Sequence, residues 1–245
     1  MTQTGTALTL MFAPGQRPDA AAVVRVAALP AENTAFSVSF QPKEPEGWLE
    51  LLAMGLAYDL TGLSPMTQAP AIPAEHLFGL DRSVLDPRPE AVRIVPGPHL
   101  AAGGALIPVV RVLAGLGAEL ARLPGLRAVG WETARSWMAP AYFMSVVRAW
   151  LSGGVFPALG LTSLVRGDDE AMTSKGLALF TGFEIELQPL AGETAQDAAR
   201  LTARVINALV EFGVNQPKPL SDGQGRQLHF DMAANNRLLR IRRQA

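Results

Sequence analysis

Two glutamates in the C-terminal third of the chain have the spacing of a paired-carboxylate site. Glu184 and Glu186 alternate with Phe183, Ile185 and Leu187, so on an extended strand both carboxylates project from one face. Side chains two positions apart on a strand lie about 7 Å from one another, a separation compatible with metal binding or acid–base chemistry. The alternative is that both residues form the solvated face of an amphipathic strand.

An aromatic and basic cluster follows a predicted strand. Trp131, Arg135 and Trp137 lie within a short segment between that strand and a helix, a position where sheet proteins place ligands. Two indole rings and a guanidinium could form a stacking or anion-binding pocket. The alternative is that the tryptophans cover the edge of a core. Together with Glu184 and Glu186, these three residues are the candidate binding site.

No catalytic or metal-binding motif accompanies these residues. The chain has no cysteine, which excludes disulfides, thiolate zinc sites and cysteine nucleophiles. His76, His99 and His229 are too far apart in sequence for a helical zinc motif. No glycine-rich phosphate loop and no Gly-x-Ser-x-Gly nucleophile elbow occurs. We therefore predict no catalytic residue, no metal and no cofactor.

Composition limits the partners of the chain. Lysine and arginine number 21 against 22 acidic residues, a net charge of −1, so no basic field gathers nucleic acid. The apolar run at 6–12 follows no basic segment and is short for a secretory signal. The apolar stretch 100–118 contains Pro108 and, near its centre, Arg111, which opposes insertion into a bilayer. We expect a cytoplasmic protein that binds neither membranes nor nucleic acid.

The elements that would position these residues follow from hydrophobic periodicity and turn signals. The clearest is a helix over 195–212, capped by Thr194 and stopped by Gly213, with an apolar stripe along one face. The region 48–63 fits neither period, and we expect a helix early in it and an extended stretch near Leu60. The other predicted strands span 7–12, 34–40, 91–95, 126–131, 156–165, 176–187, 227–232 and 237–242, and the other predicted helices span 19–29, 105–123 and 141–151.

A basic stretch ends the chain, at Arg237, Arg240, Arg242 and Arg243. On a strand, Arg240 and Arg242 point outward while the apolar residues between them point inward. We interpret it as an edge strand protected by charge.

The order of these elements predicts an α+β fold with helices packed on a mixed, largely antiparallel sheet. We expect an N-terminal β–α–β subdomain over 1–63, a proline-rich excursion or linker over 64–98 and a C-terminal α+β subdomain over 99–245. The three could also form one compact domain. Two β–α–β patterns along the chain leave room for two related α/β halves.

A family resemblance covers the run 127–189. A strand ending in Trp131, a helix and a second strand lead into the segment TSKGLALFTGFEIELQP, which contains Gly176, Leu177, Glu184 and Glu186. This run resembles the bacterial domain-of-unknown-function family 4261. The residues 180–183 differ from the Gly-Leu-Pro that precedes the glutamate in that family. The resemblance implies a bacterial protein and carries no activity with it.

Three hypotheses for function follow. The first is a non-enzymatic binding or regulatory module with a protein partner, because catalytic motifs are absent from an apolar and nearly neutral chain. The second is an enzyme whose site is assembled only in space, from Glu184 and Glu186 with Arg135 or His229. The third is a structural subunit of a homo-oligomer, which rests on the apolar fraction of 49%.

Overall fold

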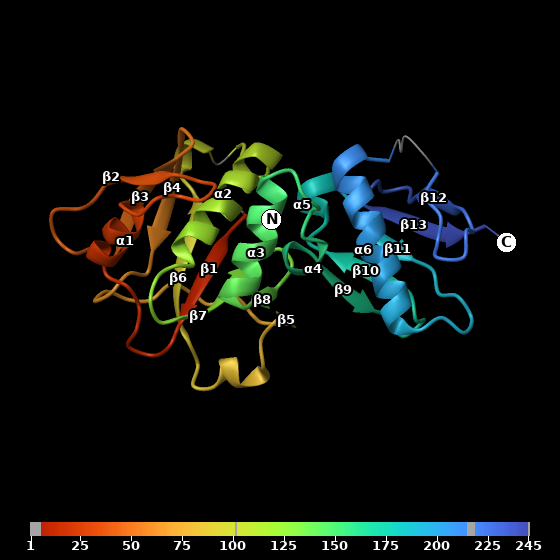
Figure 1. The fold of residues 1–245 in the computed structure, drawn as a ribbon, viewed down its shortest axis with the longest axis horizontal. Coiled ribbons are helices and arrows are strands. Elements are labelled where there is room, and N and C mark those ends of the chain that lie inside the picture. The colour runs from red at the N-terminus through yellow and green to blue at the C-terminus, as the bar shows by residue number, and fades with distance from the viewer. Residues whose placement is uncertain (1–5, 101, 215–218, 245) are drawn as a thin grey trace. The chain divides into compact units, whose positions relative to one another are not determined.

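A computed structural model describes residues 6–100, 102–214 and 219–244 of the chain (Figure 1). The chain divides into two compact units, Met1–Gly154 and Val155–Ala245. The sheet of the N-terminal unit has eight strands and that of the C-terminal unit has five. Since both are mainly antiparallel and pack with helices, the predicted α+β class is confirmed. Within the described ranges, no helix is both long enough and apolar enough to cross a bilayer.

The sheet of the N-terminal unit has the strand order β2-β3-β4-β6-β1-β7-β8-β5. Its only parallel pair among the described strands is β5 with β8. Its elements are β1 (Leu8–Phe12), α1 (Ala20–Ala27), β2 (Phe36–Phe40), β3 (Trp48–Ala53), β4 (Leu56–Thr61), β5 (His76–Phe78), η1 (Arg82–Leu85), β6 (Glu90–Pro96), η2 (Pro98–Leu100), α2 (Ile107–Leu120), β7 (Leu126–Trp131), β8 (Ser136–Met138) and α3 (Pro140–Leu151).

Helices α2 and α3 pack on one face of this sheet (Figure 1). Leu8 on the fully buried strand β1 lies against α2, where a Cβ on Gly117 would come within 2.3 Å of the Leu8 side chain. Tyr58 on β4 donates a hydrogen bond of 2.8 Å to the carbonyl oxygen of Val109 in α2. Most of the helix predicted over 105–123 is therefore present as α2, a largely buried helix packed on a sheet.

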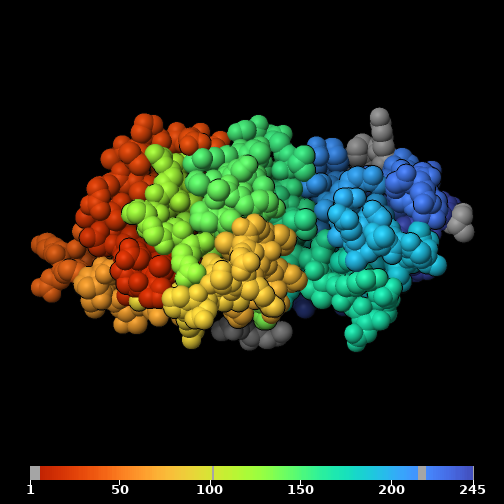
Figure 2. All heavy atoms as spheres, turned by 60° about the horizontal axis from the view of Figure 1, so that its bottom comes forward, coloured from red at the N-terminus to blue at the C-terminus, as the bar shows by residue number. Residues whose placement is uncertain are grey.

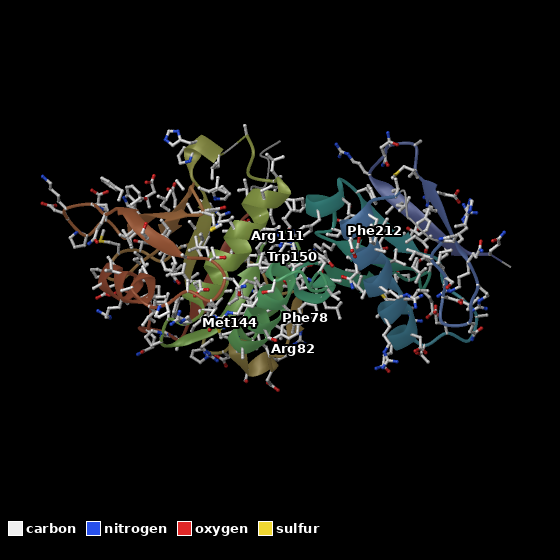
Figure 3. The ribbon with its side chains drawn as sticks, turned by 45° about the horizontal axis from the view of Figure 1, so that its top comes forward. Phe78, Arg82, Arg111, Met144, Trp150 and Phe212 are labelled. Carbon is white, nitrogen blue, oxygen red and sulfur yellow. The ribbon has the colours of Figure 1, made fainter. Side chains whose placement is uncertain are left out.

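Arg111, the charge within that apolar helix, is accommodated by an aromatic neighbour. Its guanidinium carbon lies 4.5 Å from the centre of the Trp150 ring on α3 (Figure 3). A cation over an indole face keeps favourable electrostatics where part of its hydration is lost. The arginine therefore joins α2 to α3 instead of interrupting the core.

The proline-rich segment covers the other face of the same sheet. Met11 alternates with the helix-facing residues of β1, and it forms a buried cluster with Ile72, Val84 and Trp137. After crossing this face the chain returns as β6, which pairs with both β4 and β1. The segment 64–98 thus joins strands of one sheet, and the division between units falls after Gly154 rather than within it.

Residues 48–61 form a β-hairpin, so the helix expected early in 48–63 is wrong. Strands β3 and β4 pair in continuous register across a turn at Met54 and Gly55, whose φ angles are 49° and 78°. Left-handed conformations at both turn positions match the right-handed twist of a hairpin. Leu49 and Leu51 are buried while Leu52 is exposed, and this apolar residue on the outer face hides the alternation in the sequence.

The sheet of the C-terminal unit has the strand order β12-β13-β11-β10-β9, with β11 and β13 parallel. Helix α6 (Ala195–Phe212) has the predicted bounds, with Thr194 as its N-cap and Gly213 at its end. It packs against strand β10 and the two short helices. The other elements are α4 (Ala158–Leu161), β9 (Ser163–Arg166), β10 (Met172–Lys175), α5 (Ala178–Thr181), β11 (Glu184–Leu187), β12 (Leu228–Met232) and β13 (Leu238–Arg243).

Two predicted strands of this unit are shorter than expected. The strand expected over 176–187 is strand only from Glu184, because α5 and its left-handed C-terminal residue Gly182 precede it. The strand expected over 156–165 begins at Ser163, after α4. Strand β13 lies between β12 and β11, so its interpretation as a charge-protected edge strand is also wrong.

Candidate functional site

The two tryptophans of the predicted site lie on opposite faces of the N-terminal sheet. Trp131 pairs with Leu8, which faces α2, whereas Trp137 pairs with Gly130 on the other face. Both indoles are buried. Arg135 lies in the turn between β7 and β8, with a φ of 48°, and forms a half-exposed ion pair with Glu75. The structure therefore does not bring these three side chains into one pocket.

Glu184 and Glu186 belong to the other compact unit, on strand β11, and Ile185 and Leu187 are buried between and beside them. The Glu184 carboxylate accepts a hydrogen bond from the Ser174 hydroxyl at 2.5 Å. It also accepts bonds from three consecutive backbone N–H groups, those of Gly176 (2.9 Å), Leu177 (3.2 Å) and Ala178 (3.1 Å). The carboxylate thus closes the turn that leads from β10 into α5.

Glu186 also has partners in its own unit. Its carboxylate accepts a hydrogen bond of 2.6 Å from the Gln188 side chain, and it lies 3.4 Å from the Arg240 guanidinium. The two carboxylates therefore share a strand face, as their spacing predicts, but each is held by a separate set of groups. Among the described residues, no group of three or more His, Cys, Asp or Glu side chains could hold a metal ion.

A pocket of about 590 Å³ lies elsewhere in the C-terminal unit. It is formed by the first half of α6, the loop 190–193 that precedes this helix and the loop 222–226. Leu201 contributes an apolar part of its wall. Its charged lining residues are Glu193, Asp197, Arg200, Arg204, Asp222 and Arg226.

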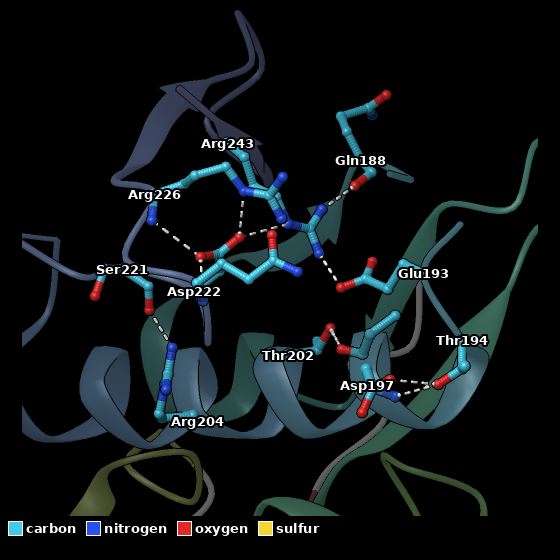
Figure 4. A network of polar contacts seen from close by, with 12 residues as sticks. Gln188, Glu193, Thr194, Asp197, Thr202, Arg204, Ser221, Asp222, Arg226 and Arg243 are labelled. Atoms are coloured by element: carbon cyan, nitrogen blue, oxygen red, sulfur yellow. Dashed lines mark hydrogen bonds and ion pairs between the residues drawn. The ribbon is translucent and has the colours of Figure 1, made fainter. Parts of the chain in front are cut away.

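A network of ion pairs lies behind one side of this pocket and joins three of its lining residues, Glu193, Asp222 and Arg226, to Arg243 (Figure 4). Arg243, at the end of β13, has only 5% of its side chain exposed. It pairs with Glu193, lies 3.6 Å from Asp222 and donates a hydrogen bond of 2.9 Å to the Gln188 carbonyl oxygen. Buried charges need such partners because the interior does not solvate them.

Asp222 anchors the loop 222–226 within this network. Burial opposes its ionisation, but hydrogen bonds from the Arg226 side chain and from the backbone N–H groups of Gln224 and Arg226 outweigh that effect. They hold the pKa of Asp222 below its ordinary value. The ion pair between Asp222 and Arg226 is 2.7 Å long. The two carboxylates beside Arg226 and Arg243 thus neutralise both of these arginines.

The arginines of α6 differ from those of the network. Arg200 and Arg204 lie four residues apart and so on one side of the helix. Arg200 is largely exposed and lies 3.5 Å from Asp197. Arg204 is exposed and donates to the carbonyl oxygen of Ser221 (Figure 4), and no carboxylate of the described chain forms an ion pair with it. The pocket therefore presents one positive charge without a counter-ion.

The pocket was not predicted from the sequence. Its only local signal is the spacing of Arg200 and Arg204 on the polar side of a predicted amphipathic helix. The loop that faces them, 222–226, begins ten residues after the helix ends at Phe212, and nothing in its own residues predicts this placement.

The chain matches no protein-family model, no curated protein and no solved structure. The function must therefore be argued from the site itself.

Proposed function

We propose that the protein is a non-enzymatic binding module, and that the pocket of its C-terminal unit takes an acidic segment of a partner protein. The observation that carries the proposal is the uncompensated charge of Arg204 on the pocket wall. An exposed guanidinium held by a neutral carbonyl oxygen keeps donors free for a carboxylate. Its neighbour Arg200 has only a long contact with Asp197, at 3.5 Å.

The charge balance of the pocket favours an acidic ligand over a basic one. Asp222 forms an ion pair of 2.7 Å with Arg226, and Glu193 forms one with Arg243. Their charges are therefore cancelled within the protein, while that of Arg204 is not. Apolar contact with Leu201 would add to the binding of a segment that also carries aliphatic groups.

The carboxylates near this pocket are poorly suited to acid–base catalysis. A carboxylate with a lowered pKa and a guanidinium partner, such as Asp222, is a weak base at neutral pH. Asp197 accepts a hydrogen bond of 2.7 Å from the Thr194 hydroxyl at the start of α6. These contacts support binding rather than turnover. The cytoplasmic location and the bacterial origin expected from the sequence remain parts of this proposal.

The proposal is tested with an oligoglutamate peptide carrying a fluorescent label, whose binding is followed by anisotropy. We expect saturable binding that weakens as salt is added. We expect Arg204→Gln to weaken it about tenfold, since a charge-assisted hydrogen bond contributes about 1.5 kcal/mol. Because Arg204 is exposed on α6 and its one contact is at the surface, we expect this variant to keep the fold.

The matched control is Arg237→Gln, which removes an equal charge from an exposed position in the turn between β12 and β13. It should leave the affinity unchanged. An oligolysine peptide should not bind. Equal losses in the Arg204 and Arg237 variants, or no binding of oligoglutamate to the unaltered protein, would reject the proposal.

A further inference from the structure

Two adjoining hollows lie along the proline-rich segment of the N-terminal unit, which covers the sheet face opposite α2 and α3. Figure 2 shows this segment at the surface, in orange and yellow. The larger hollow has a volume of about 270 Å³ and is lined by Ile72, Pro73, Leu85 and Trp137, among others. The smaller one, of about 190 Å³, continues from it, because both are bounded by Ala71, Arg88 and Pro89. The wall of the larger hollow is mainly apolar, and several lining residues of the two hollows are prolines.

Trp137 contributes part of the apolar wall of the larger hollow. Trp137 is only 4% exposed, and its buried indole Nε1–H has no acceptor among the described residues. The indole ring therefore offers a flat apolar surface to a ligand in the hollow, while its N–H stays within the protein.

Arg88 contributes an unpaired cation at the junction of the two hollows. It is exposed, and neither a hydrogen bond nor an ion pair to it occurs within the described ranges. Arg127 behaves differently, since it donates to the carbonyl oxygens of Ser83 and Pro87 in the same segment. Arg88 therefore has no structural partner that would account for its place in the wall.

We propose that the larger hollow binds a small carboxylate with an apolar body, of the size of one aromatic ring. The carboxylate pairs with Arg88, and the apolar body packs among Ile72, Pro73 and Trp137. Rigid proline walls favour such a ligand because little conformational freedom is lost when it binds. Small-molecule sites are usually concave and mostly apolar, with a small number of polar groups that orient the ligand. This site is separate from the pocket of the C-terminal unit and does not depend on its function.

The test uses benzoate as the probe and the indole N–H resonances of the full chain as the readout. The chain has only four tryptophans, and the Trp137 resonance is assigned by its loss in Trp137→Phe or, if that variant does not fold, by backbone-linked experiments. We expect this resonance to shift and saturate as benzoate is added. Benzyl alcohol, which has the ring without the carboxylate, should bind more weakly.

Arg88→Gln should weaken benzoate binding about tenfold, the loss expected for a charge-assisted contact, and leave binding of benzyl alcohol unchanged. The matched control is Arg82→Gln, on η1 of the same segment (Figure 3) and outside the lining of the two hollows. It should bind benzoate like the unaltered protein. An unmoved Trp137 resonance, equal binding of the two probes, or an Arg88 variant with unchanged affinity for benzoate would overturn the proposal.

Discussion

Substitution of Glu184 separates a structural carboxylate from a catalytic one. Each of its oxygens serves two donors: Gly176 and Ala178 on one, Ser174 and Leu177 on the other. Glu184→Gln replaces one oxygen by an amide that cannot accept, and so leaves two donors without a partner. Each unmet donor costs about 1–3 kcal/mol when buried. Because Ala178 is exposed and water can replace that bond, we expect a loss of about 2 kcal/mol.

The loss is measured by urea unfolding followed by far-UV circular dichroism, together with hydrogen exchange of the peptides that cover 174–187. All tryptophans and tyrosines lie in the N-terminal unit, so intrinsic fluorescence reports that unit and the exchange data report the C-terminal one. We expect faster exchange around α5 and an unchanged fluorescence signal in the absence of urea.

Glu186→Gln is the matched control, because it makes the same change two residues away on the same strand face. Its partner Arg240 is half exposed and 3.4 Å away, so the loss should stay below about 1 kcal/mol. If the two variants lose equal stability, or if Glu184→Gln unfolds at the same urea concentration as the unaltered protein, then Glu184 does not hold the turn as argued.

Three further substitutions test the packing and the charges. Tyr58→Phe should cost about 1 kcal/mol in urea unfolding followed by fluorescence, since the carbonyl oxygen of Val109 loses a buried donor. Burial, and then the charge of Glu50 directly across the hairpin, raise the pKa of Asp59, so ionised Asp59 opposes folding. Asp59→Asn should therefore stabilise the protein at pH 7 by up to about 1 kcal/mol, and this gain should vanish below about pH 4, where the wild-type carboxyl is protonated. The lowered pKa of Asp222 has the opposite sign: its stabilisation is present above about pH 4 and is lost as the pH falls through its native value, so Asp222→Asn should destabilise at pH 7 and approach the unaltered protein in acid.

The elements that the sequence determined are those whose causes lie within a few residues. Helix α6 has its predicted bounds because Thr194 caps it, Gly213 ends it, and the apolar stripe between them repeats at the helical period. Strand β7 and the hairpin of β12 and β13 were also predicted, from alternation and turn residues. The shared face of Glu184 and Glu186 follows from the same local rule.

The tertiary structure decided which strands and side chains became neighbours. The segment 64–89 covers a sheet face, and β6 lies between β4 and β1, because pairing of distant strands depends on contacts that no local pattern encodes. The same holds for Trp131 and Trp137, which a single turn places on opposite faces, and for the pocket where α6 meets the loop 222–226. Local periodicity determines the face of an element on which a side chain lies, whereas long-range packing decides which other side chains share that surface and whether a charge such as that of Arg204 has a partner there.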